Sequence, residues 1–253
     1  MADTKLRVTE LDFDDIKANL KNFLKAQTEF KDYDFEGSGM SILLDTLAYN
    51  THYLGFNANM LANEMFLDSA SLRSSIVSHA KTLGYEVSSC RAPKATVNVS
   101  LTTSDATKTM PAGTAFNTTV DGTSYQFVTV SDITKSNSGN AVIFDSTEIY
   151  EGTYVTTKYT VDSSNVEQRF LLGDNRADTT TLTVKVQNSA SDSTTTTYTR
   201  ATDISQLNAS STVYYLQEVE NGKFEVYFGD GVVSKALTDD NIVVLSYVVT
   251  NKS

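Results

Sequence analysis

The sequence predicts an α+β protein, in which an N-terminal segment of long helices is followed by a mainly antiparallel β-rich domain. Three observations predict this class. Apolar side chains recur at helical spacing over residues 12–83. From about residue 95 onward the pattern changes to period two and to Thr, Val, Ser and Tyr, which are typical of strands. Asn221-Gly222 then stands between two strand-like runs, as in a β-hairpin.

We expect the boundary between the two parts near residues 86–94, around Pro93. The helical segment is then 1–88, and it packs in a bundle with other chains. The β-rich domain is 95–253, divided into two subdomains near 150–175. Because few core contacts cross such a linker, we expect motion between the two parts to pivot there.

The first helix is predicted from Asp12 to Phe30, with Asp12 as its N-cap. A single apolar stripe lets it pack against one row of the next helix. A linker over residues 31–39 follows, and Ser38 or Ser41 caps the next helix. The stripe consists of Phe13, Ile16, Leu20, Phe23 and Leu24.

The stretch Ser38–Phe66 predicts one long helix with two apolar rows. At about 1.5 Å per residue it spans roughly 42 Å. The rows are displaced by two residues and lie nearly opposite each other, so we expect helices or partner chains against both. The first row, at heptad spacing, is Met40, Leu44, Leu47, Thr51, Leu54, Ala58, Leu61 and Met65. The second row is Ile42, Thr46, Tyr49, Tyr53, Phe56 and Met60.

A third helix is predicted over Ser69–Leu83. Asp68 or Ser69 caps its start, and Gly84 ends it. Its inward-facing residues are expected to be Leu72, Ile76, Ala80 and Leu83.

Short, numerous strands after residue 95 favour a sandwich or an open barrel. The run TEIYEGTYVTTKYTV reads as strand throughout, and VYYLQEVENGKFEVYF predicts a hairpin with a type I′ turn at Asn221-Gly222. The last run, NIVVLSYVVT, is apolar enough for the interior of a sheet.

Composition excludes several classes of protein. A net charge of −11 with no basic patch disfavours nucleic acid as a partner. No apolar run approaches the length of a membrane span, so no membrane partner is expected. The single cysteine, Cys90, excludes an internal disulfide framework and indicates assembly in a reducing cytoplasm.

Few residues are suited to catalysis. His52, His79 and Cys90 have no nucleophile motif or metal-ligand spacing around them, so we interpret both histidines as structural and Cys90 as incidental. The Gly229-Asp230-Gly231 sequence indicates a tight turn rather than a calcium loop. We therefore predict no enzyme activity, no cofactor and no metal, although a pair of carboxylates acting on polysaccharide is an open alternative.

The second row of the long helix has two interpretations. It could be core within one chain, or it could contact another chain, which we favour. Gly55 in mid-helix indicates the close approach of a neighbouring backbone.

The segment FKDYDFEGSGMSILLDTLAYNTHYLGFNANMLANEMFLDSASLRSSIVSHAKTLGYEVSS closely resembles the N-terminal helical region of the baseplate wedge proteins of T4-like contractile phage tails, in the baseplate J-like family. Two later motifs, MPAGTAF at 110–116 and YFGDGVVSKAL at 227–237, are similar to the same family. The family members are much longer than this chain.

The resemblance implies a structural subunit of a virion tail baseplate that transmits the conformational change of contraction. Its implied partners are a second copy and other wedge proteins, joined in a shared helical bundle. A baseplate of another contractile injection system is one alternative, and a β-rich tail adhesin or glycan-binding module is another. The candidate interface, assigned by region, is Phe23, Leu47, Tyr49, Tyr53, Leu54, Phe56, Leu61 and Met65.

Overall fold

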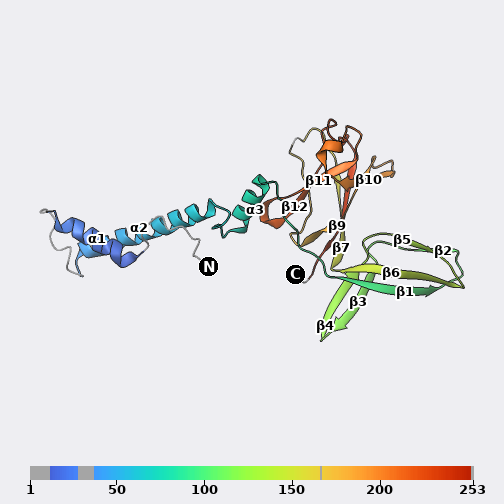
Figure 1. Ribbon diagram of the computed structural model, residues 1–253, viewed down its shortest axis with the longest axis horizontal. Helices are drawn as coiled ribbons and strands as arrows, with labels where there is room; N and C mark the ends of the chain where they lie inside the picture. Colours follow the sequence, from blue (N-terminus) through green and yellow to red (C-terminus); the bar gives the residue numbers. More distant parts are fainter. Residues whose placement is uncertain (1–11, 28–36, 166, 252–253) are drawn as a thin grey trace. The chain divides into compact units, whose positions relative to one another are not determined.

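The computed structural model describes residues 12–27, 37–165 and 167–251 (Figure 1). The chain divides into two compact units, Met1–Val87 and Ser88–Ser253. The first unit is helical and the second is built of mainly antiparallel strands, which confirms the predicted α+β class.

The first unit begins with two capped helices, α1 (Phe13–Lys25) and α2 (Gly39–Glu64). Asp12 caps α1 by accepting the Asp14 N–H at 2.8 Å, and Ser38 caps α2 by accepting the Ser41 N–H at 3.1 Å. Of the two cap candidates, Ser38 is therefore correct. The predicted end of the first helix is wrong, because α1 ends at Lys25, just after the last residue of its apolar stripe. Phe30 and residues 31–36 of the linker lie outside the described residues.

Helix α1 packs against the N-terminal half of α2, where Ser41, Leu44 and Ala48 are buried. An ion pair between Lys17 and Asp45 joins the two helices. Of these three residues only Leu44 belongs to a predicted row, and the next member of that row, Leu47, is exposed, so α1 covers neither predicted row as a whole. Phe23 also departs from its predicted stripe and is exposed.

Helix α3 (Arg73–Thr82) begins later than predicted. Neither Asp68 nor Ser69 caps it, and the Ser69 hydroxyl instead donates to the Asn63 carbonyl at 2.7 Å. Gly84 ends the helix as predicted, with φ +79° and Schellman hydrogen bonds from the Gly84 and Tyr85 N–H groups to Lys81 and Ala80. The prediction that its apolar face points inward is wrong, because this unit leaves three of those residues exposed. They are Leu72, Ile76 and Leu83.

The first half of the second unit holds a four-stranded sheet and a two-stranded sheet. Met110, Val142 and Phe144 form the buried core of this half. The larger sheet has the order β1 (Lys94–Thr102), β6 (Ala141–Glu151), β4 (Thr123–Val128), β3 (Ala115–Val120), and the smaller pairs β2 (Thr107–Met110) with β5 (Ile133–Ser136).

The second half is a seven-stranded sheet that curls on itself. The Tyr159 hydroxyl donates to the Leu171 carbonyl at 2.7 Å, and the Tyr159 and Phe170 rings meet edge to face at 5.7 Å, so the two edge strands lie in contact. Of the two predicted architectures, the open barrel is correct for this half. The strand order is β7 (Thr153–Thr160), β13 (Ile242–Val249), β9 (Ala177–Gln187), β10 (Thr195–Arg200), β11 (Val213–Glu218), β12 (Phe224–Tyr227), β8 (Phe170–Leu171).

Two strand predictions are confirmed. β13 lies between β7 and β9, in the interior of the sheet. β11 and β12 form the predicted hairpin, in which Asn221 (φ 59°) and Gly222 (φ 73°) both have the positive φ of a type I′ turn, within the short 3₁₀ segment Glu220–Gly222. A second 3₁₀ segment spans Ile204–Gln206.

The run TEIYEGTYVTTKYTV is divided between two sheets, contrary to its prediction as continuous strand. β6 ends at Glu151 and β7 begins at Thr153. Between them Gly152 has φ +132°, and a Cβ there would overlap the carbonyl oxygen of Val249. Only glycine permits both this conformation and this close approach of the β13 backbone.

The predicted pivot at 86–94 is mostly fixed to the second unit. Ser89 accepts the Thr179 N–H at 3.0 Å, the Ala92 N–H donates to the Asp178 carboxylate at 2.9 Å, and the Pro93 carbonyl accepts the Glu151 N–H at 2.8 Å. Hydrogen bonding of this kind prevents a hinge, so a pivot has room only before Ser89.

Replacing Gly152 by Ala tests the close approach to β13. We expect the free energy of unfolding to fall by more than about 3 kcal/mol, because backbone strain and steric overlap add. The matched control is Gly122→Ala, where φ is also positive (+75°) but the new Cβ meets nothing within 4 Å. We expect the control to cost about 1 kcal/mol. Urea denaturation measures the free energy of unfolding of both variants. Equal losses of this free energy would show that the close approach to Val249 is unimportant.

Candidate interaction surface of the helical unit

Helix α2 is unusually poor in charge. Its sequence, GMSILLDTLAYNTHYLGFNANMLANE, holds Asp45 and Glu64 and no Lys or Arg. Both carboxylates are engaged, Asp45 with Lys17 and Glu64 with the start of α3. A helix that faces water normally carries charged residues on its outer side, and α2 lacks such a side.

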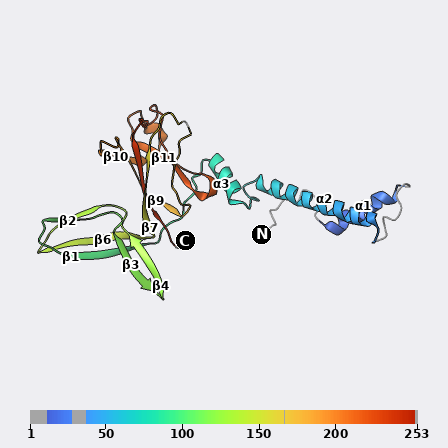
Figure 2. The same cartoon turned by 180° about the vertical axis from the view of Figure 1, so that it is seen from behind.

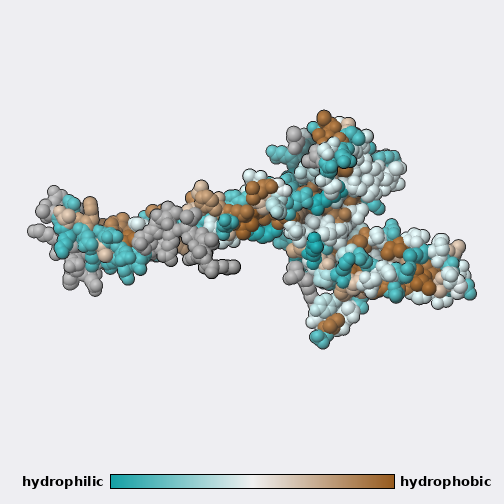
Figure 3. Space-filling view, viewed as in Figure 1, coloured by the Kyte–Doolittle hydropathy of each residue, from teal (hydrophilic) through white to brown (hydrophobic). Residues whose placement is uncertain are grey.

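All eight residues of the predicted interface are exposed within this chain. Their exposed fractions lie between 46% for Leu47 and 68% for Leu61. Figure 3 shows hydrophobic side chains at the surface of the helical unit. Large exposed apolar side chains gathered in this way are typical of a protein–protein interface. The other members are Phe23, Tyr49, Tyr53, Leu54, Phe56 and Met65.

The second row is aromatic over its middle turns. Tyr49 and Tyr53, one helical turn apart, stack with their ring centroids 6.3 Å apart and their planes at 27°. This contact holds the two rings side by side on the surface and reduces the side-chain entropy that binding would cost.

The face that is already covered shares only Leu44 with the two rows. It runs along α2 through positions that are buried or half-buried, and several of them are small or polar. At about 100° per residue, this third face lies on one side of the helix between the two nearly opposite rows, roughly 100–120° from each. One face is thus covered within the chain and two are open. The third face consists of Ser41, Leu44, Ala48, His52, Gly55 and Asn59.

The end of α2 is joined to α3 by Glu64. Its carboxylate accepts the Ser71 N–H at 2.9 Å, the Ser71 hydroxyl at 2.7 Å and the Leu72 N–H at 3.2 Å. These groups stand at the start of α3, where a helix needs acceptors. The Ser71 N–H, with hydroxyl hydrogen bonds from Ser75 and Ser71, lowers the pKa of Glu64 from 4.5 to about 2.

His79 completes this corner. Its Nε2 lies 2.9 Å from the Glu64 carbonyl oxygen, so one residue of α2 is held by both the start and the end of α3. The structural interpretation of His79 is confirmed. His52 lies half-buried on the third face of α2.

Sequence reasoning missed the role of Glu64. The sequence offered two signals. Glu64 is a carboxylate at the end of a nearly uncharged helix, and the short helix that follows has Leu72, which has no capping side chain, at its N-cap position. These signals are weak, because the capping acceptor comes from a different helix and not from the residue before α3.

The remaining candidates for chemistry lie apart in the second unit. Cys90 is half-buried, with its Sγ 3.9 Å from the Asn175 carbonyl. Asp230 accepts the Val232 N–H at 2.9 Å and Gly231 has φ +88°, which confirms the tight turn. Within the described ranges, no group of three or more His, Cys, Asp or Glu is placed to hold a metal ion. The helices of those ranges are also too short or too polar to cross a membrane.

Two family models match the chain. Residues 12–85 match the helical domain of baseplate wedge proteins described as gp6-like, and residues 154–251 match the third domain of the bacteriophage baseplate wedge protein gp6. Baseplate wedge protein gp6 of Enterobacteria phage T4 is 33% identical to the chain over 261 residues. The alignment covers 94% of this chain and 38% of that relative, so the chain spans well under half of its length.

The Glu64 cap makes a prediction about pH. Because the folded-state pKa lies below the ordinary value of 4.5, the cap stabilises the corner above about pH 4.5 and is lost as pH falls toward 2. We expect the amide proton shifts of Ser71 and Leu72, measured by NMR, to titrate with a midpoint near 2. In Glu64→Gln they should not titrate. A midpoint near 4.5 in the wild type would contradict the cap.

Proposed function

By its helical domain and its third domain the chain belongs to the gp6-like baseplate wedge proteins, and we propose that it is a structural subunit of a contractile phage tail baseplate. In this proposal it acts in the virion as a scaffold and not as an enzyme. The helical unit attaches it to other wedge chains, and the β-rich unit braces its neighbours.

The open surface of α2 carries the proposal. A helix with two exposed apolar rows and no Lys or Arg is costly in water, because each large apolar side chain loses roughly 1.5–3 kcal/mol of burial free energy when left exposed. Partner chains that cover the rows would recover this free energy. The surface is therefore suited to permanent assembly rather than to brief contact.

The arrangement of the three faces supports a bundle with more than one partner. α1 covers the N-terminal part of the third face from within the chain, and the first and second rows each need another helix. We propose a second copy of this chain and a helix of another wedge protein as the two neighbours. The first row has heptad spacing, which suits knobs-into-holes packing, and the Tyr49–Tyr53 pair offers a broad aromatic contact on the second.

We also propose that the subunit transmits movement when the tail contracts. The support is the division into two compact units, with a link before Ser89 that is followed by a firmly hydrogen-bonded segment. Movement of the helical bundle would then act on the β-rich unit through a short joint rather than through a long flexible linker.

A charge placed in the first row tests the assembly role. We expect the wild-type chain, of 27.7 kDa, to associate in solution and Leu54→Asp to weaken that association at least tenfold, because burying an unpaired carboxylate opposes binding. The matched control is Asn22→Asp on the exposed side of α1, which should leave association unchanged. Light scattering over a wide concentration range measures the mass, and circular dichroism checks that the chain is folded. A wild-type monomer whose helices melt on Leu54→Asp would contradict the proposal.

A further inference from the structure

The two segments that flank the strands of the β-rich unit lie beside each other. Ser89–Pro93 precedes β1 and Thr250–Asn251 follows β13, and we call these two connections the entry and the exit. The Ala92 N–H donates to Asp178 on β9 at 2.9 Å, and the Thr250 N–H donates to the carbonyl of nearby Arg176 at 3.2 Å. Entry and exit are thus both attached around the beginning of β9.

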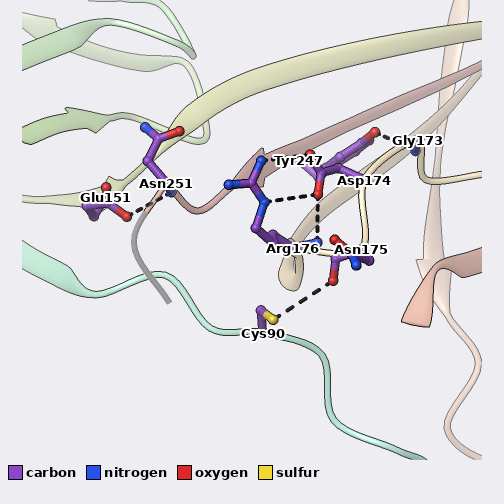
Figure 4. A network of polar contacts seen from close by, with 8 residues as sticks. All are labelled: Cys90, Glu151, Gly173, Asp174, Asn175, Arg176, Tyr247 and Asn251. Atoms are coloured by element: carbon purple, nitrogen blue, oxygen red, sulfur yellow. Dashed lines mark hydrogen bonds and ion pairs between the residues drawn. The ribbon is translucent and has the colours of Figure 1, made fainter. Parts of the chain in front are cut away.

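Glu151 joins the entry to the exit directly. Its backbone N–H donates to the Pro93 carbonyl at 2.8 Å, while its carboxylate accepts the Thr250 hydroxyl at 2.8 Å and the Asn251 N–H at 3.3 Å. Figure 4 shows the Glu151 carboxylate facing Asn251, and Cys90 of the entry segment facing Asn175. The Glu151 residue is 2% exposed and Thr250 is fully buried. Hydrogen bonds shielded from water in this way are strong and costly to break.

Buried groups around Glu151 reinforce this connection. The Asp178 carboxylate, 1% exposed, also accepts the Thr180 N–H at 2.9 Å and the Thr180 hydroxyl at 2.6 Å. Ala92 of the entry packs in one apolar cluster with Val128 of β4 and Val248 of β13. Strands from both halves of the unit therefore meet at this point.

The position of these contacts decides how the unit responds to tension. Pulling on the entry would first open Lys94 from Tyr150, the outermost pair of β1 and β6. Pulling on the exit would first open Val249 from Thr153 and Ala177, the outermost pairs of β13. Strands separate from their ends first, and the Glu151 contacts would have to break before the start of β1 or the end of β13 could separate.

We propose that Glu151 is the centre of a mechanical clamp that joins the entry and the exit of the β-rich unit. Tension between the two connections passes through the clamp and bypasses the sheets. This inference goes beyond the scaffold role, and it concerns only contacts within the chain.

Single-molecule stretching tests the clamp. The full chain is held by its two termini in optical tweezers, and the lifetime of the folded β-rich unit is measured at constant force. We expect Glu151→Ala and Thr250→Val to shorten this lifetime at least tenfold more than their loss of equilibrium stability in urea accounts for. Glu151→Gln keeps an acceptor and should restore part of the lifetime.

The matched control is Glu225→Ala on β12, a strand that carries neither connection. Glu225 is also a buried carboxylate, held by the Arg169 Nε and Nη2 at 3.1 and 3.0 Å. In Glu225→Ala, the lifetime of the folded β-rich unit under force should change only in proportion to the loss of equilibrium stability. If Glu151→Ala and Thr250→Val behave as this control does, the clamp does not exist. Because Val keeps the shape of Thr, Thr250→Val alone decides the question when Glu151→Ala does not fold.

Discussion

The organisation of this chain depends on the exposed apolar surface of α2. A helix of 26 residues with two carboxylates and no Lys or Arg has little reason to remain in water on two of its three faces. α1 is long enough to cover only the N-terminal part of the third face, and α3 turns away after the Glu64 corner. The helical unit therefore leaves two apolar rows uncovered within the single chain.

The β-rich unit must join two halves that have separate cores. These cores are centred on Val142 and Phe144 in one half and on Leu245 and Tyr247 in the other. What unites them is a small region where Gly152, the start of β9 and the end of β13 come into contact. Buried carboxylates at Glu151 and Asp178 satisfy the backbone N–H groups that strand pairing leaves unpaired there. The two halves are thus joined at the place where the first strand begins and the last strand ends.

Sequence periodicity was enough to find α2, the Asn221-Gly222 hairpin, the interior strand β13 and the class of the fold, because each depends on local pattern. The eight interface residues were selected by the same pattern, and all prove exposed in the isolated chain, although their contact with partners stays a prediction. The end of α1 was missed although it follows the last apolar residue of its stripe, whereas the other failures were tertiary. The start of α3 depends on a carboxylate from α2, the break at Gly152 depends on the Val249 backbone, and the fixed entry at Ser89–Pro93 depends on residues of β9 and β6. Residues that are adjacent in the sequence do not reveal such distant partners.

The Glu64 corner also constrains the length of α2. α3 has ten residues, too few to form a stable helix alone, and its first N–H groups find their acceptor on α2. One residue inserted into or deleted from α2 would turn Glu64 by about 100° relative to the helix start and move it about 1.5 Å along the axis. The acceptor would then point away from Ser71, and both apolar rows would change register at once. Substitutions along α2 can be absorbed one at a time, whereas a change in its length cannot, so its length should vary far less among relatives than its composition.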